Sequence, residues 1–217
     1  NGTIDVPNFY GGFTRGAASI PLPTDPYNQQ NAALGLDPTS ATAPTTTQIR
    51  TALGITGGSG VPDGVYVPND GTSITGGIYV QGTLTKCYMY VNAAANQVYV
   101  LTRGSSTDTL VVNKAAHTTR FYDQSAGTST TYQGTADDIL FVNGTLSNLS
   151  GPSRVSGVVQ PALAEHTQVL IATTGDITVQ SDVTCKNFDT GDNVLGLYSS
   201  GGSVRIGSSA PRDVSID

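Results

Sequence analysis

The chain has 217 residues, of which 37% are apolar and only 12% charged, with 26 glycines, 11 prolines and no tryptophan. The net charge of −6 argues against a general binder of nucleic acid or anionic membrane, because such proteins carry a basic face. Abundant Gly, Ser and Thr with so little charge is typical of turn-rich β-structure, and the apolar fraction is too high for a disordered chain. No apolar run has the length of a transmembrane helix.

The chain opens on Asn1-Gly2-Thr3-Ile4, which matches the second half of a seven-residue unit that recurs further on. Full copies occupy residues 78–84 (IYVQGTL) and 140–146 (LFVNGTL), and a looser copy occupies 177–183 (ITVQSDV). Each copy alternates apolar residues and then turns at Gly or Ser, as expected of a short strand followed by a corner.

Units of this kind bury their apolar faces only when they stack on one another. The sequence therefore predicts an all-β fold, a right-handed parallel β-solenoid (β-helix), as one domain over residues 1–217. Because the chain starts and stops inside such units, we expect it to be a fragment of a longer protein.

An aromatic cluster of Phe9, Tyr10 and Phe13 follows the opening half-unit. We expect it to plug the end of the solenoid, and an exposed platform for sugar is the alternative. Two short helices are predicted next. In the first, Asp25 is the N-cap, Pro26 the first helical residue and Gly35 the terminator. In the second, Thr47 is the cap, residues 48–53 the body and Gly54 the terminator.

Residues 86–135 interrupt the repeat. Strand-like segments at 87–91, 97–101, 110–113 and 118–122 are joined by short polar turns, of which Asn113-Lys114-Ala115-Ala116 is the tightest. We expect an antiparallel insertion of two hairpins that projects from the solenoid, followed by a Ser/Thr/Gly-rich loop at 125–135. From Asp138 onward the strand units resume.

The insertion is the preferred candidate for a partner surface, because the solenoid itself has no need of it. Its tyrosines Tyr88, Tyr90 and Tyr99 are the aromatic candidates. A contact with DNA is an alternative, and it would use the basic residues of the insertion, Lys86, Arg103, Lys114 and Arg120.

Cys87 and Cys185 are the two cysteines, and each follows a copy of the repeat at a similar offset. In neighbouring stacked strands such positions would lie about 4.8 Å apart, within reach of a disulfide. A bridge closing roughly 100 residues would stabilise the fold by about 4 kcal/mol. Two separate buried thiols are the alternative, and no motif indicates a metal-binding or nucleophilic cysteine.

The acidic residues gather at Asp137-Asp138, at Asp176 with Asp182, and at 189–193. Solenoid polysaccharide hydrolases and lyases use carboxylates on one face, and Ca²⁺ accepts oxygen ligands of this kind. None of the spacings is diagnostic, and Asp is a common turn residue. We therefore predict no catalytic residue, no metal site and no cofactor, and expect His117 and His166 at the surface.

Several stretches resemble one family: 20–24 (IPLPT), 28–33 (NQQNAA), 63–68 (DGVYVP), 76–82 (GGIYVQG) and 193–206 (NVLGLYSSGGSVRI). Together they resemble a bacterial domain-of-unknown-function family of envelope proteins associated with type IV pili, in pilin-like and PilX-like chains. The resemblance implies an extracytoplasmic β-solenoid module, usually behind an N-terminal hydrophobic helix, and it supplies no catalytic residues.

We therefore expect a non-enzymatic structural or adhesion module of the bacterial cell surface or of a type IV pilus, a rigid solenoid that displays the insertion. Its partners would be other pilus or envelope proteins or a surface ligand, and any membrane contact would be made outside this chain. A carbohydrate-active solenoid enzyme, either a polysaccharide lyase or a hydrolase, and a DNA-contacting pilus tip are the alternatives.

Overall fold

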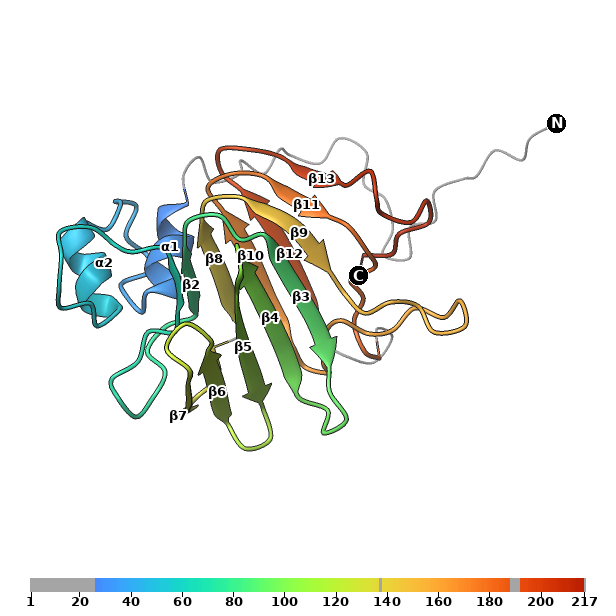
Figure 1. Cartoon of the computed structure of the whole chain (residues 1–217), viewed down its shortest axis with the longest axis horizontal. Helices are drawn as coiled ribbons and strands as arrows, with labels where there is room; N and C mark the ends of the chain where they lie inside the picture. Colours follow the sequence, from blue (N-terminus) through green and yellow to red (C-terminus); the bar gives the residue numbers. More distant parts are fainter. Residues whose placement is uncertain (1–25, 137, 188–191, 217) are drawn as a thin grey trace.

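Two β-sheets lie face to face in the computed structural model, which describes residues 26–136, 138–187 and 192–216 (Figure 1). The five-stranded sheet has, in spatial order, β1 (Gly64–Tyr66), β2 (Ile78–Gln81), β8 (Ile139–Asn143), β10 (Gln168–Thr173) and β12 (Val194–Ser199). The eight-stranded sheet has β13 (Val204–Ile206), β11 (Ile177–Val179), β9 (Leu146–Ser150), β3 (Lys86–Val91), β4 (Gln97–Arg103), β5 (Ser106–Asn113), β6 (Thr118–Asp123) and β7 (Thr128–Gln133).

Four strands in each sheet run parallel to one another. In the first sheet β2, β8, β10 and β12 pair in parallel, and in the second sheet β3, β9, β11 and β13 do the same. The remaining strands, β1 and β4 to β7, pair antiparallel. The prediction of a mostly-β fold with two short helices is confirmed, but the sheets are mixed, with antiparallel strands beside the parallel ones.

The two best copies of the repeat are neighbours in this arrangement. Ile78 pairs with Leu140 in β2 and β8, and Leu84 pairs with Leu146 beyond the corner. The amides at the corner also meet, because Asn143 Nδ2 donates to Gln81 Oε1 (3.1 Å). The repeat in the sequence therefore corresponds to a repeat in space.

The third copy predicted at 177–183 is wrong. Ile177 pairs with Leu146, and it is Ile171 that pairs with Leu140. The third unit is therefore 171–177 (IATTGDI). An alternation of apolar residues recurs in every strand of this kind, so it does not determine how one unit aligns with the next. The corner glycine determines this alignment, since the Gly175 N–H donates to the carbonyl oxygen of Gly144 (2.8 Å).

The corner glycines sit where two chains approach most closely. A Cβ added to Gly144 would lie 2.6 Å from the carbonyl oxygen of Gly82, a backbone atom of the neighbouring unit. Atoms at that distance overlap, and a backbone carbonyl held in a strand ladder has little room to move. Glycine is therefore required at this corner for packing rather than for its backbone angles.

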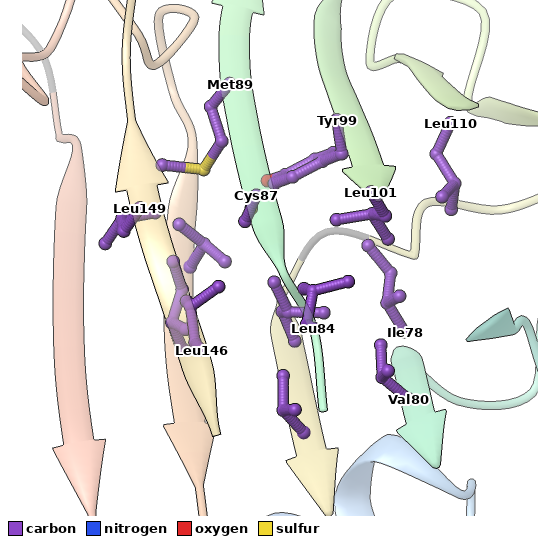
Figure 2. Close-up of a cluster of buried hydrophobic side chains, with 14 of the residues drawn as sticks. Ile78, Val80, Leu84, Cys87, Met89, Tyr99, Leu101, Leu110, Leu146 and Leu149 are labelled. Atoms are coloured by element: carbon purple, nitrogen blue, oxygen red, sulfur yellow. The ribbon is translucent and has the colours of Figure 1, made fainter. Parts of the chain in front are cut away.

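The core lies between the two sheets. Ile78 and Val80 of β2 face Leu101 and Leu110 of the antiparallel strands, and all four side chains are fully buried (Figure 2). Further inward-facing side chains in the same cluster are Leu84, Cys87, Met89, Tyr99, Leu140, Val142, Leu146, Leu149, Ile177 and Val179. The core is continuous, so the parallel strands and the insertion form one packed body.

Burial ends at the last unit of the stack. Val204 and Ile206 of β13 are neighbours of the buried Ile177 and Val179 in β11. Yet Val204 and Ile206 are 45% and 50% exposed. The stack therefore ends at the edge strand β13, where the apolar side chains of Val204 and Ile206 are half-exposed.

Helix α1 (Tyr27–Ala33) covers the outer face of the five-stranded sheet, where Ala33 and Leu34 pack with Tyr79 and Phe141. Asp25, its predicted cap, lies outside the described residues, and Pro26 occupies the N-cap position rather than the first helical position. The prediction that Gly35 ends this helix is confirmed, because Gly35 has φ 69°.

Helix α2 (Thr46–Ala52) begins earlier than predicted. Thr45, not Thr47, is the N-cap: Thr45 Oγ1 accepts from the Gln48 N–H (3.3 Å), and Gln48 Oε1 accepts from the Thr45 N–H (2.8 Å). Thr45, Thr46 and Thr47 are equally good caps by residue type. Only Thr45 has a glutamine three residues later, Gln48, and can form a capping box with it. Neither helix has the length and apolar character of a membrane span.

The insertion differs from the predicted two hairpins. Strands β3 to β7 form one antiparallel meander, and β3 also pairs in parallel with β9, so the insertion continues the sheet instead of projecting from it. Residues 128–133, predicted as loop, form the edge strand β7. Its side chains are mostly exposed and polar on both faces, so the sequence carries no alternation that would reveal a strand.

Some predictions fall on residues that the structure does not describe. They are the half-unit at 1–4, the aromatic cluster of Phe9, Tyr10 and Phe13, and the carboxylates Asp137 and Asp189.

Candidate ligand-binding groove

The outer face of β3 carries three of the predicted partner residues in a continuous stack. The rings of Tyr88 and Tyr90 stack with centroids 5.4 Å apart and planes at 28°. Lys86 Nζ lies 5.1 Å from the centroid of the Tyr88 ring. Residues i, i+2 and i+4 of a strand share one face, so the order Lys86, Tyr88, Tyr90 follows directly from the alternation of β3.

A groove of about 370 Å³ runs beside this stack. Tyr88, Tyr90 and Val91 form one wall. The loop after β9 and the segment after β11 form the other wall, and the residues they contribute are Pro152, Gln160, Pro161 and Lys186. Apolar surface with a few polar groups is the usual lining of a ligand site.

Hydrogen bonds from the core hold the loop wall in place. Gln97, which is 1% exposed, donates from Nε2 to the Ala162 carbonyl (3.0 Å) and accepts at Oε1 from the Ala164 N–H (2.8 Å). Leu163 then forms a parallel bridge with Cys185. The side chains of Gln160 and Pro161 are therefore supported by a strand of the meander.

An ion-pair network fastens the other end of this loop. Arg154 Nε and Nη2 donate to Asp182 Oδ2 and Oδ1 at 2.8 and 2.9 Å, and Arg154 Nη1 donates to Asp213 Oδ2 (2.8 Å). Asp182 is 1% exposed and also accepts from the Ser215 N–H (2.8 Å). Arg154 holds the pKa of Asp182 below its usual value, so this carboxylate stays charged and paired.

The remaining predicted partner residues lie elsewhere. Tyr99 is fully buried, so it must be removed from the predicted surface: it pairs with the inward-facing Met89 and therefore points to the core. Arg103 and Lys114 stand at opposite ends of β5, about 25 Å apart for a strand of this length. Arg120 is on β6, where its Nε donates to Ser129 Oγ (2.9 Å). The four basic residues therefore do not form one patch.

Three of the carboxylates weighed for catalysis, Asp176, Asp182 and Asp192, are engaged by a basic side chain. Asp176 is bonded to Arg205, which lowers the pKa of Asp176, and Asp182 is bonded to Arg154. Asp192 Oδ1 lies 2.6 Å from His166 Nδ1, with both side chains exposed, and this contact lowers the pKa of Asp192. The described residues hold no cluster of three or more His, Cys, Asp or Glu that would bind a metal ion.

The predicted disulfide is corrected by the strand order. Cys87 is a free, buried thiol on β3, where it pairs with Leu149 of β9. Cys185 lies beyond the end of β11 and forms a bridge with Leu163, so the two cysteines are not paired with each other across neighbouring strands. The expectation failed because it assumed that the looser copy of the repeat was adjacent to the first.

The thiol of Cys87 is expected to be inert in the folded protein. Burial raises its pKa to about 12, so almost no thiolate is present near neutral pH. In concentrated guanidinium without reductant, a chromogenic disulfide reagent should titrate two thiols per chain, and in the native protein Cys87 should not react. No titratable thiol in the unfolded chain would establish the bridge after all.

Sequence reasoning found one wall of the groove and missed the other. Pro152, Gln160, Pro161 and Lys186 belong to loops between strand units, and their approach to β3 depends on the long-range bridge between Leu163 and Cys185. No local pattern signals such a contact. The prolines at 152 and 161, which bracket the loop at 153–160, were the one available indication that it has a defined path.

Comparisons with protein-family models, with curated proteins and with solved structures gave no match, so the resemblance to pilus-associated envelope proteins stays a prediction.

Proposed function

We propose that this chain is a non-enzymatic adhesion module of the bacterial cell surface that holds a carbohydrate ligand in the groove beside Tyr88 and Tyr90. The observation that carries the proposal is the groove itself. Stacked tyrosines form one wall, and the opposite wall is fixed to the core by Gln97 and to the C-terminal segment by Arg154. A site whose walls are already held loses little entropy on binding.

The scaffold in this proposal is a right-handed parallel β-solenoid whose second sheet is extended by the meander. Four successive strand–corner–strand units in parallel support it, as does the stacking of their corner glycines. Right-handed crossovers are strongly preferred between parallel strands. A stiff stack of this kind suits a spacer that carries a binding face away from its anchor.

The proposed setting is extracytoplasmic, in a type IV pilus or another envelope assembly whose proteins would be its partners. The family resemblance supports this setting, and so does a composition rich in hydroxyl groups and poor in charge. A binding role is favoured over hydrolysis or elimination because Asp176, Asp182 and Asp192 are each committed to a basic neighbour.

Electrophoresis of the native protein through gels containing dissolved polysaccharides, both neutral and acidic, tests the proposal. We expect at least one polysaccharide to retard the wild type, and Tyr90→Ala to weaken that binding by about tenfold. Tyr122→Ala is the matched control. Tyr122 is 42% exposed on β6 of the same sheet but does not line the groove, so its loss should leave the mobility shift unchanged.

Two results would contradict the proposal. An equal loss from both tyrosine variants would remove the groove as the binding site. Shortening of the polysaccharide during incubation with the protein would establish an enzyme in place of an adhesion module.

A further inference from the structure

The groove has a charge opposite to that of the chain as a whole. Lys186 is the one charged residue in its lining, and Lys86 extends the tyrosine stack. Among the described residues neither lysine takes part in an ion pair, and no carboxylate lines the groove. In a chain with a net charge of −6, this is a local site for an anion.

One polar side chain lines the groove with Lys186, and a second lies next to Tyr88. Gln160 Nε2 donates to the Val158 carbonyl (3.1 Å), which fixes the orientation of the amide at the wall. Ser150 pairs in register with Tyr88, so their side chains share the outer face of the sheet. Ser150 is 6% exposed, and its hydroxyl makes no hydrogen bond. A buried hydroxyl without a partner marks a place for water or for a polar ligand.

We infer that the groove recognises an acidic carbohydrate, a uronate-containing polysaccharide, and this inference rests on the proposed function. A uronate sugar has an apolar ring face for Tyr90, hydroxyl groups for the amide of Gln160, and a carboxylate for Lys186. A charged hydrogen bond between the ammonium and the carboxylate supplies the selectivity over neutral sugars.

Nucleic acid fits this site less well. Binding to a phosphate backbone uses several cations spaced along the strand. Here Lys186 is the one cation in the groove lining and Lys86 lies over Tyr88 at the start of β3, while Arg103, Lys114 and Arg120 lie on other parts of the meander. The density of positive charge matches one or two sugar carboxylates rather than a run of phosphates.

Polygalacturonate and its fully methyl-esterified form are the matched probes, because esterification removes the charge and keeps the sugar backbone. With fluorescently labelled oligomers and an anisotropy titration, we expect the acid form to bind at least about tenfold more tightly than the ester. Lys186→Gln should remove most of this preference. Lys114→Gln changes the chain charge equally, on the turn after β5, and should not.

Each other outcome overturns the inference. Equal binding of acid and ester, unaffected by Lys186→Gln, would leave an adhesion module without charge selectivity. Equal losses from the two lysine variants would indicate diffuse electrostatics and no defined site. Tighter binding of labelled single-stranded DNA than of polygalacturonate would assign the lysines to nucleic acid. Failure to bind any polysaccharide, neutral or acidic, would remove the proposed function together with the inference.

Discussion

Replacing Gly144 with alanine is expected to destabilise the fold by about 2–3 kcal/mol, which lowers the melting temperature by roughly 5–10 °C. The added Cβ would stand 2.6 Å from the Gly82 carbonyl oxygen and 3.0 Å from the Thr83 nitrogen. Both are backbone atoms of the adjoining unit, and the Gly82 N–H in turn donates to the Asn143 carbonyl (3.2 Å). The corner can relieve the overlap only by separating two hydrogen-bonded strands.

Urea unfolding followed by circular dichroism measures this loss. Gly57→Ala is the matched control, because no atom lies within 4 Å of an added Cβ there, and it should change the free energy of unfolding by less than about 0.5 kcal/mol. If the two alanine variants were equally stable, the corners would not be in contact, and the stacking of repeat units would be disproved.

Ile177→Ala is expected to cost about 3 kcal/mol or more, whereas the same substitution at Ile206 should cost less than about 1 kcal/mol. Ile177 is fully buried on β11, with strands on both sides. Ile206 lies on the neighbouring edge strand β13 and is 50% exposed. The chemical change is identical, so the difference isolates the burial that one further strand provides.

Chemical denaturation of the two variants under identical conditions gives the comparison. A large loss at Ile206, close to that at Ile177, would mean that the end of the stack is covered in solution. A second copy or another segment packed on β13 would then have to be sought, beginning with the concentration dependence of the melting temperature.

The sequence is most informative where a local pattern and a long-range contact coincide. The units at 78–84 and 140–146 are recognisable because the same side chains must fit against each other, from Ile78 on Leu140 to Leu84 on Leu146. The unit at 171–177 has Thr173 and Thr174 where the others have Val and an amide, so similarity of letters points to the wrong segment. Spatial register, not letter similarity, defines the repeat.

The same distinction between local pattern and long-range contact applies to the candidate site. The shared face of Lys86, Tyr88 and Tyr90 can be predicted from the alternation within β3. The prediction of Tyr99 at the surface is wrong because Tyr99 pairs with Met89, and paired residues point to the same face of a sheet. Gln160 and Lys186 reach the groove only through loop paths that tertiary contacts decide. Alternation assigns a face within a strand, but pairing between strands decides which face is buried.

The meander also bears on how quickly the chain can fold. The strands β2 and β8 pair across 62 residues, and closing so large a loop is slow when nothing shortens it. The meander between them consists of neighbouring hairpins, which form on a microsecond scale. Its last strand returns to the start: the Gln133 N–H donates to Thr72 (2.9 Å) and the Ile74 N–H to Gln133 (2.7 Å). Once these hairpins have formed, β2 and β8 are already close together, and the first parallel pair closes as though it were local.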